Sequence, residues 1–214
     1  LGSLDPDMLT PEYITRLAAV DKLCPQYHLS LQSGCSATLR RMRRVYTAEQ
    51  YAQVVDQLRA AYGERPVSFT TDCICGFPGE TQADFAELEQ FVRDVRFERL
   101  GVFAYSEEEG TYSAQKLQDN VPEEVKQQRV ERIMTLQNDI ARENNQRRVG
   151  RTERVLIDSR QGNYYVGRTQ YDSPEVDQEI LIPAAERRLL RGHFYEIRID
   201  GAADYDLYGK AVGK

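Results

Sequence analysis

Apolar residues in the first 150 positions recur with two spacings that alternate along the chain. Residues 27–32 alternate apolar and polar side chains, residues 67–75 are rich in β-branched and aromatic residues, and residues 99–105 form a third such segment, which predicts three strands. Between them, apolar side chains at helical spacing predict helices after Ser36, Thr47 and Thr81. Gln50 completes a capping box with Thr47. This order of elements predicts an α/β fold with a parallel sheet and right-handed crossovers.

A long, highly charged helix is predicted after Pro122, with its end near Gly150. Its buried face is marked by apolar residues at helical spacing, namely Val125, Ile133, Leu136 and Ile140. The mixed charges on the same segment are Glu123, Lys126, Arg129 and Glu131. Such alternating charges are typical of a solvated helix face, so we expect these four side chains to lie in water.

From Glu153 onward the pattern changes to short alternating strands. They are predicted at residues 154–158, 164–169, 179–182, 194–199 and 207–212. Short strands separated by turns rich in Gly and Asp predict a small closed β-barrel. We therefore expect two domains, residues 1–150 and residues 151–214.

The composition excludes several classes of protein. The net charge is −6 and neither predicted domain has an excess of basic residues, which argues against simple binding of a polyanion. The apolar runs are far shorter than the roughly 20 residues that a membrane span needs. The first residues do not resemble a signal peptide, and the four cysteines lack the spacing of a disulfide scaffold. We expect free thiols, a cytoplasmic location and no membrane partner.

Three loops follow the predicted strands, at residues 31–35, 75–81 and 103–106, where parallel α/β proteins bind their ligands. In the second loop, Gly76 and Gly79 would let the backbone approach a flat ligand, although an ordinary strand-to-helix turn explains the same spacing. A basic run follows the first loop and consists of Arg40, Arg41, Arg43 and Arg44. It is either a solvated helix face or an anchor for a carboxylate or phosphate.

The residues that could bind a metal do not form a convincing set. Cys73 and Cys75 are predicted to be small buried side chains rather than a metal pair. His28 and His193 lack a Cys or carboxylate partner at ligand spacing, so each is predicted to be a satisfied strand histidine. A (β/α) enzyme with Glu80 or His28 as general base is a weaker alternative, because the sequence places no partner within reach.

Several longer motifs occur together and in a fixed order. They are residues 23–35 (LCPQYHLSLQSGC), 38–42 (TLRRM), 76–81 (GFPGET), 104–106 (AYS) with Gly110 and Thr111, and 121–126 (VPEEVK). These motifs resemble those of the methylthiotransferases of the radical-SAM superfamily, and the resemblance covers essentially the whole chain. It implies a partial radical-SAM (β/α) barrel in residues 1–150, followed by a small all-β barrel of the TRAM type.

The resemblance implies the cofactors S-adenosylmethionine and 4Fe-4S clusters. Family members hold one cluster on a Cys-x-x-x-Cys-x-x-Cys loop and use it to reduce S-adenosylmethionine to a 5′-deoxyadenosyl radical, which abstracts hydrogen from the substrate. That loop does not occur in this sequence. We expect the cluster-binding segment to lie outside the chain, and we expect the chain alone to be inactive, with no catalytic or metal-binding residue of its own.

Carried over residue by residue, the family's cofactor contacts fall on all three loops. The first loop contributes Gln32, Ser33 and Gly34, the second Gly76, Phe77, Pro78 and Glu80, and the third Tyr105 and Ser106. The first group would lie near the methionine and ribose of the cofactor. The second would lie near its adenine and ribose, and the third would line the same opening.

The substrate implied by the resemblance differs along the chain. The first 80 or so residues resemble the branch that modifies threonylcarbamoyladenosine in tRNA, whereas residues 97–111 and the tail resemble the branch that methylthiolates an aspartate of a small-subunit ribosomal protein. An acidic rim on the predicted barrel would suit a basic ribosomal protein and repel RNA, and consists of Asp172, Glu175, Asp177 and Glu179. We therefore predict the ribosomal protein as partner, with tRNA and a non-catalytic module that binds ribosomes or RNA as alternatives.

Overall fold

The computed structural model describes residues 2–174 and 177–213, which divide into two compact units. The first unit comprises residues Leu1–Leu23 and Tyr27–Gln137, and the second comprises Cys24–Gln26 and Asn138–Lys214. The division falls inside α6 (Glu123–Gln146). The domain boundary near residue 150 that the sequence pattern indicates stays a prediction.

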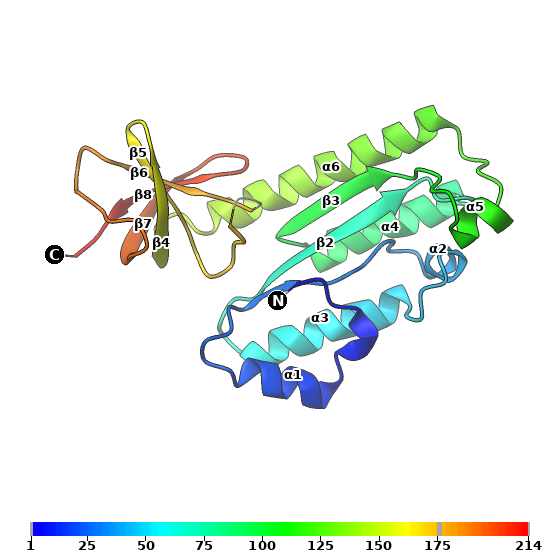
Figure 1. The fold of residues 1–214 in the computed structure, drawn as a ribbon, viewed down its shortest axis with the longest axis horizontal. Coiled ribbons are helices and arrows are strands. Elements are labelled where there is room, and N and C mark those ends of the chain that lie inside the picture. The colour runs from blue at the N-terminus through cyan, green and yellow to red at the C-terminus, as the bar shows by residue number, and fades with distance from the viewer. Residues whose placement is uncertain (1, 175–176, 214) are drawn as a thin grey trace. The chain divides into compact units, whose positions relative to one another are not determined.

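A three-stranded sheet forms the centre of the first unit, in the order β1 (Gln26–His28), β2 (Ser68–Cys75), β3 (Arg99–Ala104) (Figure 1). β2 and β3 are parallel, with Thr70 opposite Arg99. β1 is shorter than predicted, but pairing with β2 continues to Gln32, whose backbone N–H donates to the Asp72 carbonyl over 3.0 Å. The predicted parallel α/β arrangement is confirmed.

Six helical segments accompany the sheet before α6: η1 (Pro6–Met8), α1 (Pro11–Ala18), α2 (Ser36–Arg41), α3 (Ala48–Tyr62), α4 (Gln82–Val95) and α5 (Tyr112–Lys116). The capping box predicted at Thr47 and Gln50 is present at the start of α3. Thr81 and Asp84 form a second capping box at the start of α4. Each N-cap stabilises its helix by about 1 kcal/mol, so the local sequence fixes where α3 and α4 begin.

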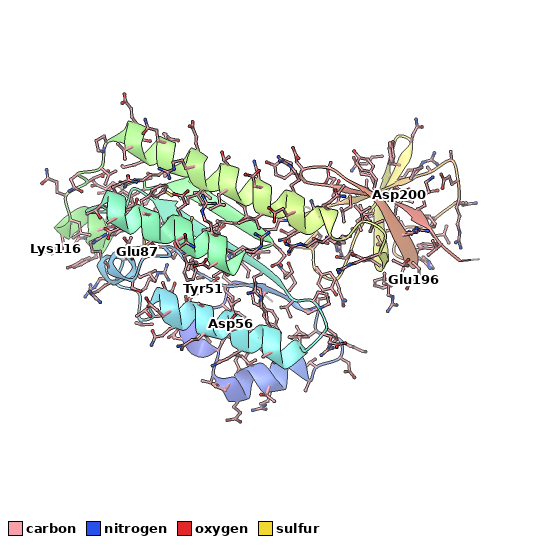
Figure 2. The ribbon with its side chains drawn as sticks, turned by 180° about the vertical axis from the view of Figure 1, so that it is seen from behind. Tyr51, Asp56, Glu87, Lys116, Glu196 and Asp200 are labelled. Carbon is pink, nitrogen blue, oxygen red and sulfur yellow. The ribbon has the colours of Figure 1, made fainter. Side chains whose placement is uncertain are left out.

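Aromatic rings fill the space between the helices and the sheet. Tyr51 on α3 is completely buried, and its ring centroid lies 5.9 Å from that of Phe91 on α4 and 6.0 Å from that of Phe97. Figure 2 labels Tyr51 and, on the same helix, Asp56, whose side chain is 78% exposed. Burial of a large apolar side chain contributes about 1.5–3 kcal/mol, so these rings account for much of the packing of α3.

The two faces of β2 differ in character. Cys73 and Cys75 are both fully buried on one face, because residues two apart on a strand point in the same direction. Their complete burial confirms that these residues are small buried side chains. A hydrogen bond with Cys75 and burial raise the pKa of the Cys73 thiol well above its ordinary value. Asp72 and Ile74 point to the opposite face, where Phe103 of β3 is 56% exposed.

The second unit contains a closed five-stranded barrel (Figure 1). Its strands are β4 (Thr152–Gln161), β5 (Tyr164–Arg168), β6 (Ile180–Pro183), β7 (Phe194–Ala202) and β8 (Leu207–Ala211), which pair in the order β4-β5-β6-β8-β7. Alternate residues such as Val155, Ile157 and Ile197 fill its core, while Glu196 and Asp200 on β7 are exposed (Figure 2). The predicted small β-barrel is confirmed.

All four cysteines carry free thiols; Cys24 is exposed and the other three are buried. In residues 2–174 and 177–213, no helix combines the length and the apolar character needed to cross a membrane.

Candidate cofactor site

A cavity of about 690 Å³ lies at the carboxyl ends of β2 and β3. In Figure 1 the arrowheads of both strands point toward the end of the unit that holds α2 and α5. The lining residues come from the loop between β1 and α2, the end of α2 and the turn after it, β2 and the loop that follows it, the end of β3, and the segment from there into α5. They are Gln32, Arg41–Arg44, Asp72, Ile74, Phe77, Phe103–Ser106, Glu108 and Thr111–Ser113. The cavity therefore occupies the position where parallel α/β folds bind ligands.

Four of the nine predicted cofactor residues line this cavity: Gln32, Phe77, Tyr105 and Ser106. Gln32 has a left-handed backbone (φ 66°), an unusual conformation for a residue other than glycine. The rings of Phe77 and Tyr105 meet edge to face, with centroids 5.1 Å apart. The Tyr105 hydroxyl is buried and has no hydrogen-bond partner among the described residues, so it is available to a ligand.

The other five predicted residues do not line the cavity, and instead shape the loops around it. Ser33 is fully buried and its Oγ accepts a hydrogen bond from the Cys35 N–H over 3.2 Å. Gly34 packs so closely on α4 that a Cβ there would lie 2.6 Å from the Cβ of Phe91. The remaining three, Gly76, Pro78 and Glu80, belong to the turn between β2 and α4.

Glu80 holds that turn to α6. Its Oε1 accepts hydrogen bonds from the Gly76 N–H over 2.8 Å and from Arg129 Nη1 over 2.7 Å, and its side chain is 1% exposed. Burial raises the pKa of Glu80, and the Gly76 N–H and the Arg129 guanidinium offset only part of that shift. The arrangement gives Glu80 a bracing role in the turn.

Two of the charges expected in water are instead buried. Lys126 and Arg129 on α6 are 5% and 6% exposed, so the prediction of a solvated face is wrong for both. Lys126 Nζ donates to Asp119 Oδ2 over 2.6 Å and to the Tyr105 carbonyl over 3.3 Å. Both cations are tolerated because an acidic partner faces each of them, and together they tie the loops after β2 and β3 to one helix.

Most of the basic run lies at the cavity. Arg41, Arg43 and Arg44 line it, whereas Arg40 is exposed and is not among the lining residues. Arg41 forms an ion pair with Asp84 over 2.7 Å, and Arg44 approaches Asp5 at 3.6 Å. The position of these side chains favours an anchor over a purely solvated face.

The Arg41–Asp84 pair makes stability depend on pH. Burial raises the pKa of Asp84, but hydrogen bonds from the Thr81 backbone and from Arg41 outweigh it, so the pKa lies below the ordinary aspartate value of 3.8. A lowered folded-state pKa contributes stability that is present above the unfolded pKa and is lost as pH falls through the folded pKa.

We therefore expect Asp84→Asn to destabilise the first unit at neutral pH, and to differ much less from the parent once the pH falls below the lowered folded-state pKa of Asp84, where both side chains are neutral. Urea unfolding at several pH values measures this. Asp56→Asn serves as control, because that carboxylate is 78% exposed and lies 3.9 Å from Arg59. An Asp84→Asn deficit that stays constant with pH would contradict the assignment.

The histidines and possible metal ligands give a mixed result. His28 Nδ1 lies 3.0 Å from Thr70 Oγ1, which confirms a satisfied strand histidine, and its Nε2 lies 3.6 Å from Asp72 Oδ2. His193 is exposed and precedes β7, so the same prediction is wrong for it. In the part of the chain that the structure describes, no group of three His, Cys, Asp or Glu side chains could hold a metal ion.

The predicted acidic rim of the barrel is not a continuous exposed surface. Asp172 is 8% exposed, accepts a hydrogen bond from Thr169 Oγ1 over 2.5 Å and lies 3.9 Å from Arg148, so it turns inward and does not belong to a rim. Asp177 is half-buried and accepts a hydrogen bond from the Ser173 N–H over 2.7 Å, and Glu179 is also half-buried. Glu175 lies outside the described residues.

Two family profiles match the chain. The profile of the radical SAM superfamily matches residues 2–92, and that of the TRAM domain matches residues 149–212. Coproporphyrinogen III oxidase (HemN) from Escherichia coli, described as a radical SAM enzyme, is similar in structure with a TM-score of 0.54. That similarity covers 78% of this chain and 45% of the other at 15% sequence identity, and it shows the fold.

Curated relatives are similar over most of the chain. The ribosomal protein uS12 methylthiotransferase RimO of Phocaeicola vulgatus is 46% identical over 193 residues, which cover 90% of this chain and 44% of that protein. The RimO protein of Bacteroides thetaiotaomicron is 43% identical over 91% of this chain and 44% of its own length. The RimO protein of Porphyromonas gingivalis is 44% identical over 89% of this chain and 44% of its own length. The chain thus spans less than half the length of these relatives.

The parallel sheet and the closed barrel, together with the two profiles, identify a partial radical SAM α/β domain followed by a TRAM domain. The chain is a homologue of the RimO uS12 methylthiotransferases. This confirms the resemblance to radical-SAM methylthiotransferases and the predicted fold class.

Proposed function

We propose that this chain is the C-terminal part of a radical SAM methylthiotransferase that methylthiolates an aspartate of ribosomal protein uS12. The observation that carries the proposal is sequence identity of 43–46% to proteins named for uS12 methylthiotransfer, over about nine-tenths of this chain. The match extends over both the radical SAM part and the TRAM domain. The cavity at the strand ends supports the proposal, because its position suits a cofactor in this class of fold.

The lining of the cavity fits S-adenosylmethionine. Ile74, Phe77 and Phe103 offer apolar and aromatic surface to an adenine ring, and Gln32 and Asp72 offer hydrogen-bonding groups to ribose hydroxyls or to the amino acid moiety. The unpartnered Tyr105 hydroxyl adds one more polar group at the same place. When bound, the cofactor would supply radical chemistry and a methyl group. The chain's own residues would bind it, orient it and exclude water.

The described residues do not fit a 4Fe-4S cluster, because they provide no set of three potential ligands, and Cys35, Cys73 and Cys75 are all buried. We therefore propose that the cluster ligands come from a part of the protein other than these residues, and no step of the reaction is assigned to them.

The barrel would bind the protein substrate. Of the acidic residues proposed to contact basic uS12, Asp177 and Glu179 remain candidates, because both are partly exposed. Contact between Glu175 and uS12 is also proposed, although this residue lies outside the described residues.

Parallel binding titrations of the complete gene product, with its clusters reconstituted, test the choice of substrate. We expect uS12 to bind at least about tenfold more tightly than unmodified tRNA. A basic ribosomal protein of similar charge serves as control for nonspecific attraction. Tight, salt-sensitive binding of tRNA together with weak binding of uS12 would support the tRNA branch instead.

A further inference from the structure

Arg43 occupies a backbone position that usually belongs to glycine. α2 ends at Arg41 with Met42 as its C-cap, and the chain then turns so that the Arg43 N–H donates to the Arg40 carbonyl and the Arg44 N–H to the Leu39 carbonyl. Arg43 has φ 61°, in the left-handed region. Helices often end this way, and glycine or asparagine fits the turn better than arginine, which suffers a steric penalty there. A strained backbone conformation beside a ligand cavity is a reason to look for a function.

The Arg43 side chain is held in place by an aromatic ring. Its guanidinium carbon lies 4.2 Å from the centroid of the Tyr112 ring, and both residues line the cavity. Arg41 and Arg44 line the same cavity, but each is directed to a carboxylate of the protein, Asp84 and Asp5. Within the described residues, Arg43 forms no ion pair, so its N–H groups are not committed to a carboxylate of the chain.

We propose that Arg43 and Tyr112 form a carboxylate clamp at this cavity. The contact with the ring restricts the exposed guanidinium on one side and leaves N–H groups free to bind a carboxylate through two parallel hydrogen bonds. Asp72 and Glu108 also line the cavity and would repel a multiply charged phosphate more than a single carboxylate.

The identity of the carboxylate that binds to the clamp rests on the proposed function, which supplies two candidate ligands. These are the acidic side chain of the protein substrate and the methionine carboxylate of the cofactor, and both present the same chemistry to Arg43.

The test compares Arg43→Gly with Arg96→Gly in the complete gene product. Arg96 also has a left-handed backbone, with φ 56° at the end of α4, but is not among the residues that line the cavity. Both substitutions relieve the same kind of backbone strain, and thermal unfolding of both variants shows that each is folded at the temperature of the binding experiments. Tyr112→Leu provides an independent loss of the clamp without a change at Arg43.

Two pairs of probes separate the two sources of carboxylate. S-adenosylhomocysteine is compared with 5′-methylthioadenosine, which lacks the amino acid portion. A uS12 peptide with its acceptor aspartate is compared with the same peptide carrying asparagine. In one of the two pairs, Arg43→Gly and Tyr112→Leu are expected to weaken binding of the probe that carries the carboxylate about tenfold or more. Binding of the matched probe without that carboxylate should change little. Arg96→Gly should leave both pairs unchanged.

The proposal is overturned if Arg43→Gly weakens both members of each pair equally, or weakens neither. It is also overturned if the loss appears with an RNA oligonucleotide instead, which would indicate a phosphate site. If the parent protein does not bind the uS12 peptide, the proposed function fails, while the pair of adenosyl probes still decides whether the clamp exists.

Discussion

Arg129→Met is expected to lower the free energy of unfolding of the first unit by about 3–5 kcal/mol, because it leaves the buried Glu80 carboxylate without its counter-ion. Glu80 and Arg129 are 1% and 8% exposed at their side chains and 2.7 Å apart. Urea unfolding followed by circular dichroism measures the loss.

Arg132→Met is the matched control, because Arg132 lies on the same helix and pairs with Glu89 over 2.6 Å, but its side chain is 54% exposed. Exposed pairs contribute about 0–1 kcal/mol, so a similarly small loss for Arg129→Met would contradict the bracing role of Glu80.

The deficit of Arg129→Met should depend on pH. Burial raises the folded-state pKa of Glu80, and loss of the guanidinium raises it further. A group with a raised folded pKa binds more protons in the folded state, so the stability of the variant increases as pH falls through that pKa. The deficit relative to the parent should therefore become smaller in acid.

Gly76→Ala is expected to destabilise the first unit by about 2–4 kcal/mol, from the left-handed backbone together with overpacking. Gly76 has φ 77°, and a Cβ there would lie 2.3 Å from Cγ of the buried Lys126. The stem of Lys126 has little freedom to move, because its Nζ is bonded to Asp119 and to the Tyr105 carbonyl.

Gly79→Ala isolates the contribution of that contact. Gly79 has a nearly identical φ of 78°, but a Cβ there would meet its nearest neighbour, Arg41 Cδ, at an ordinary 3.5 Å. Its expected loss is about 1–2 kcal/mol. Equal losses for the two variants in the same unfolding experiment would show that Lys126 does not restrict the turn.

The local pattern predicts most elements of the fold, but not η1, α1 or α5. The capping box at Thr47 and Gln50 lies within four residues, and alternation along 154–158 needs no distant partner. Lys126 and Arg129 were predicted to be solvated for the same reason, since nearby charges of both signs surround them. Glu80, which makes burial of Arg129 possible, lies 49 residues away and cannot be found from helical periodicity.

The candidate site was predicted in part. The rule that ligands bind at carboxyl ends of parallel strands indicates the three loops, whereas Gln32, Phe77, Tyr105 and Ser106 within them were implied by the resemblance to the methylthiotransferases. Alternation along β2 could also have indicated Asp72 and Ile74, since they lie on the face opposite the buried Cys73 and Cys75. Tyr112 could not be predicted, because its approach to Arg43 depends on how two loops fold together.

On the barrel, residue type alone predicted the wrong environment for Asp172. A carboxylate in a turn is usually exposed, but Thr169 and Arg148 supply hydrogen-bonding and charged partners that allow it to be buried. Arg148 precedes the barrel strands in sequence, and the pairing arises only when the second unit is folded.

The most direct test of the proposed function is mass spectrometry of uS12 and of tRNA after incubation with the complete gene product, its clusters, S-adenosylmethionine and a reductant. The proposal predicts a methylthio group on an aspartate of uS12 and no change in the tRNA. A methylthio group on the tRNA, or an unmodified uS12 with a fully reconstituted enzyme, would contradict it.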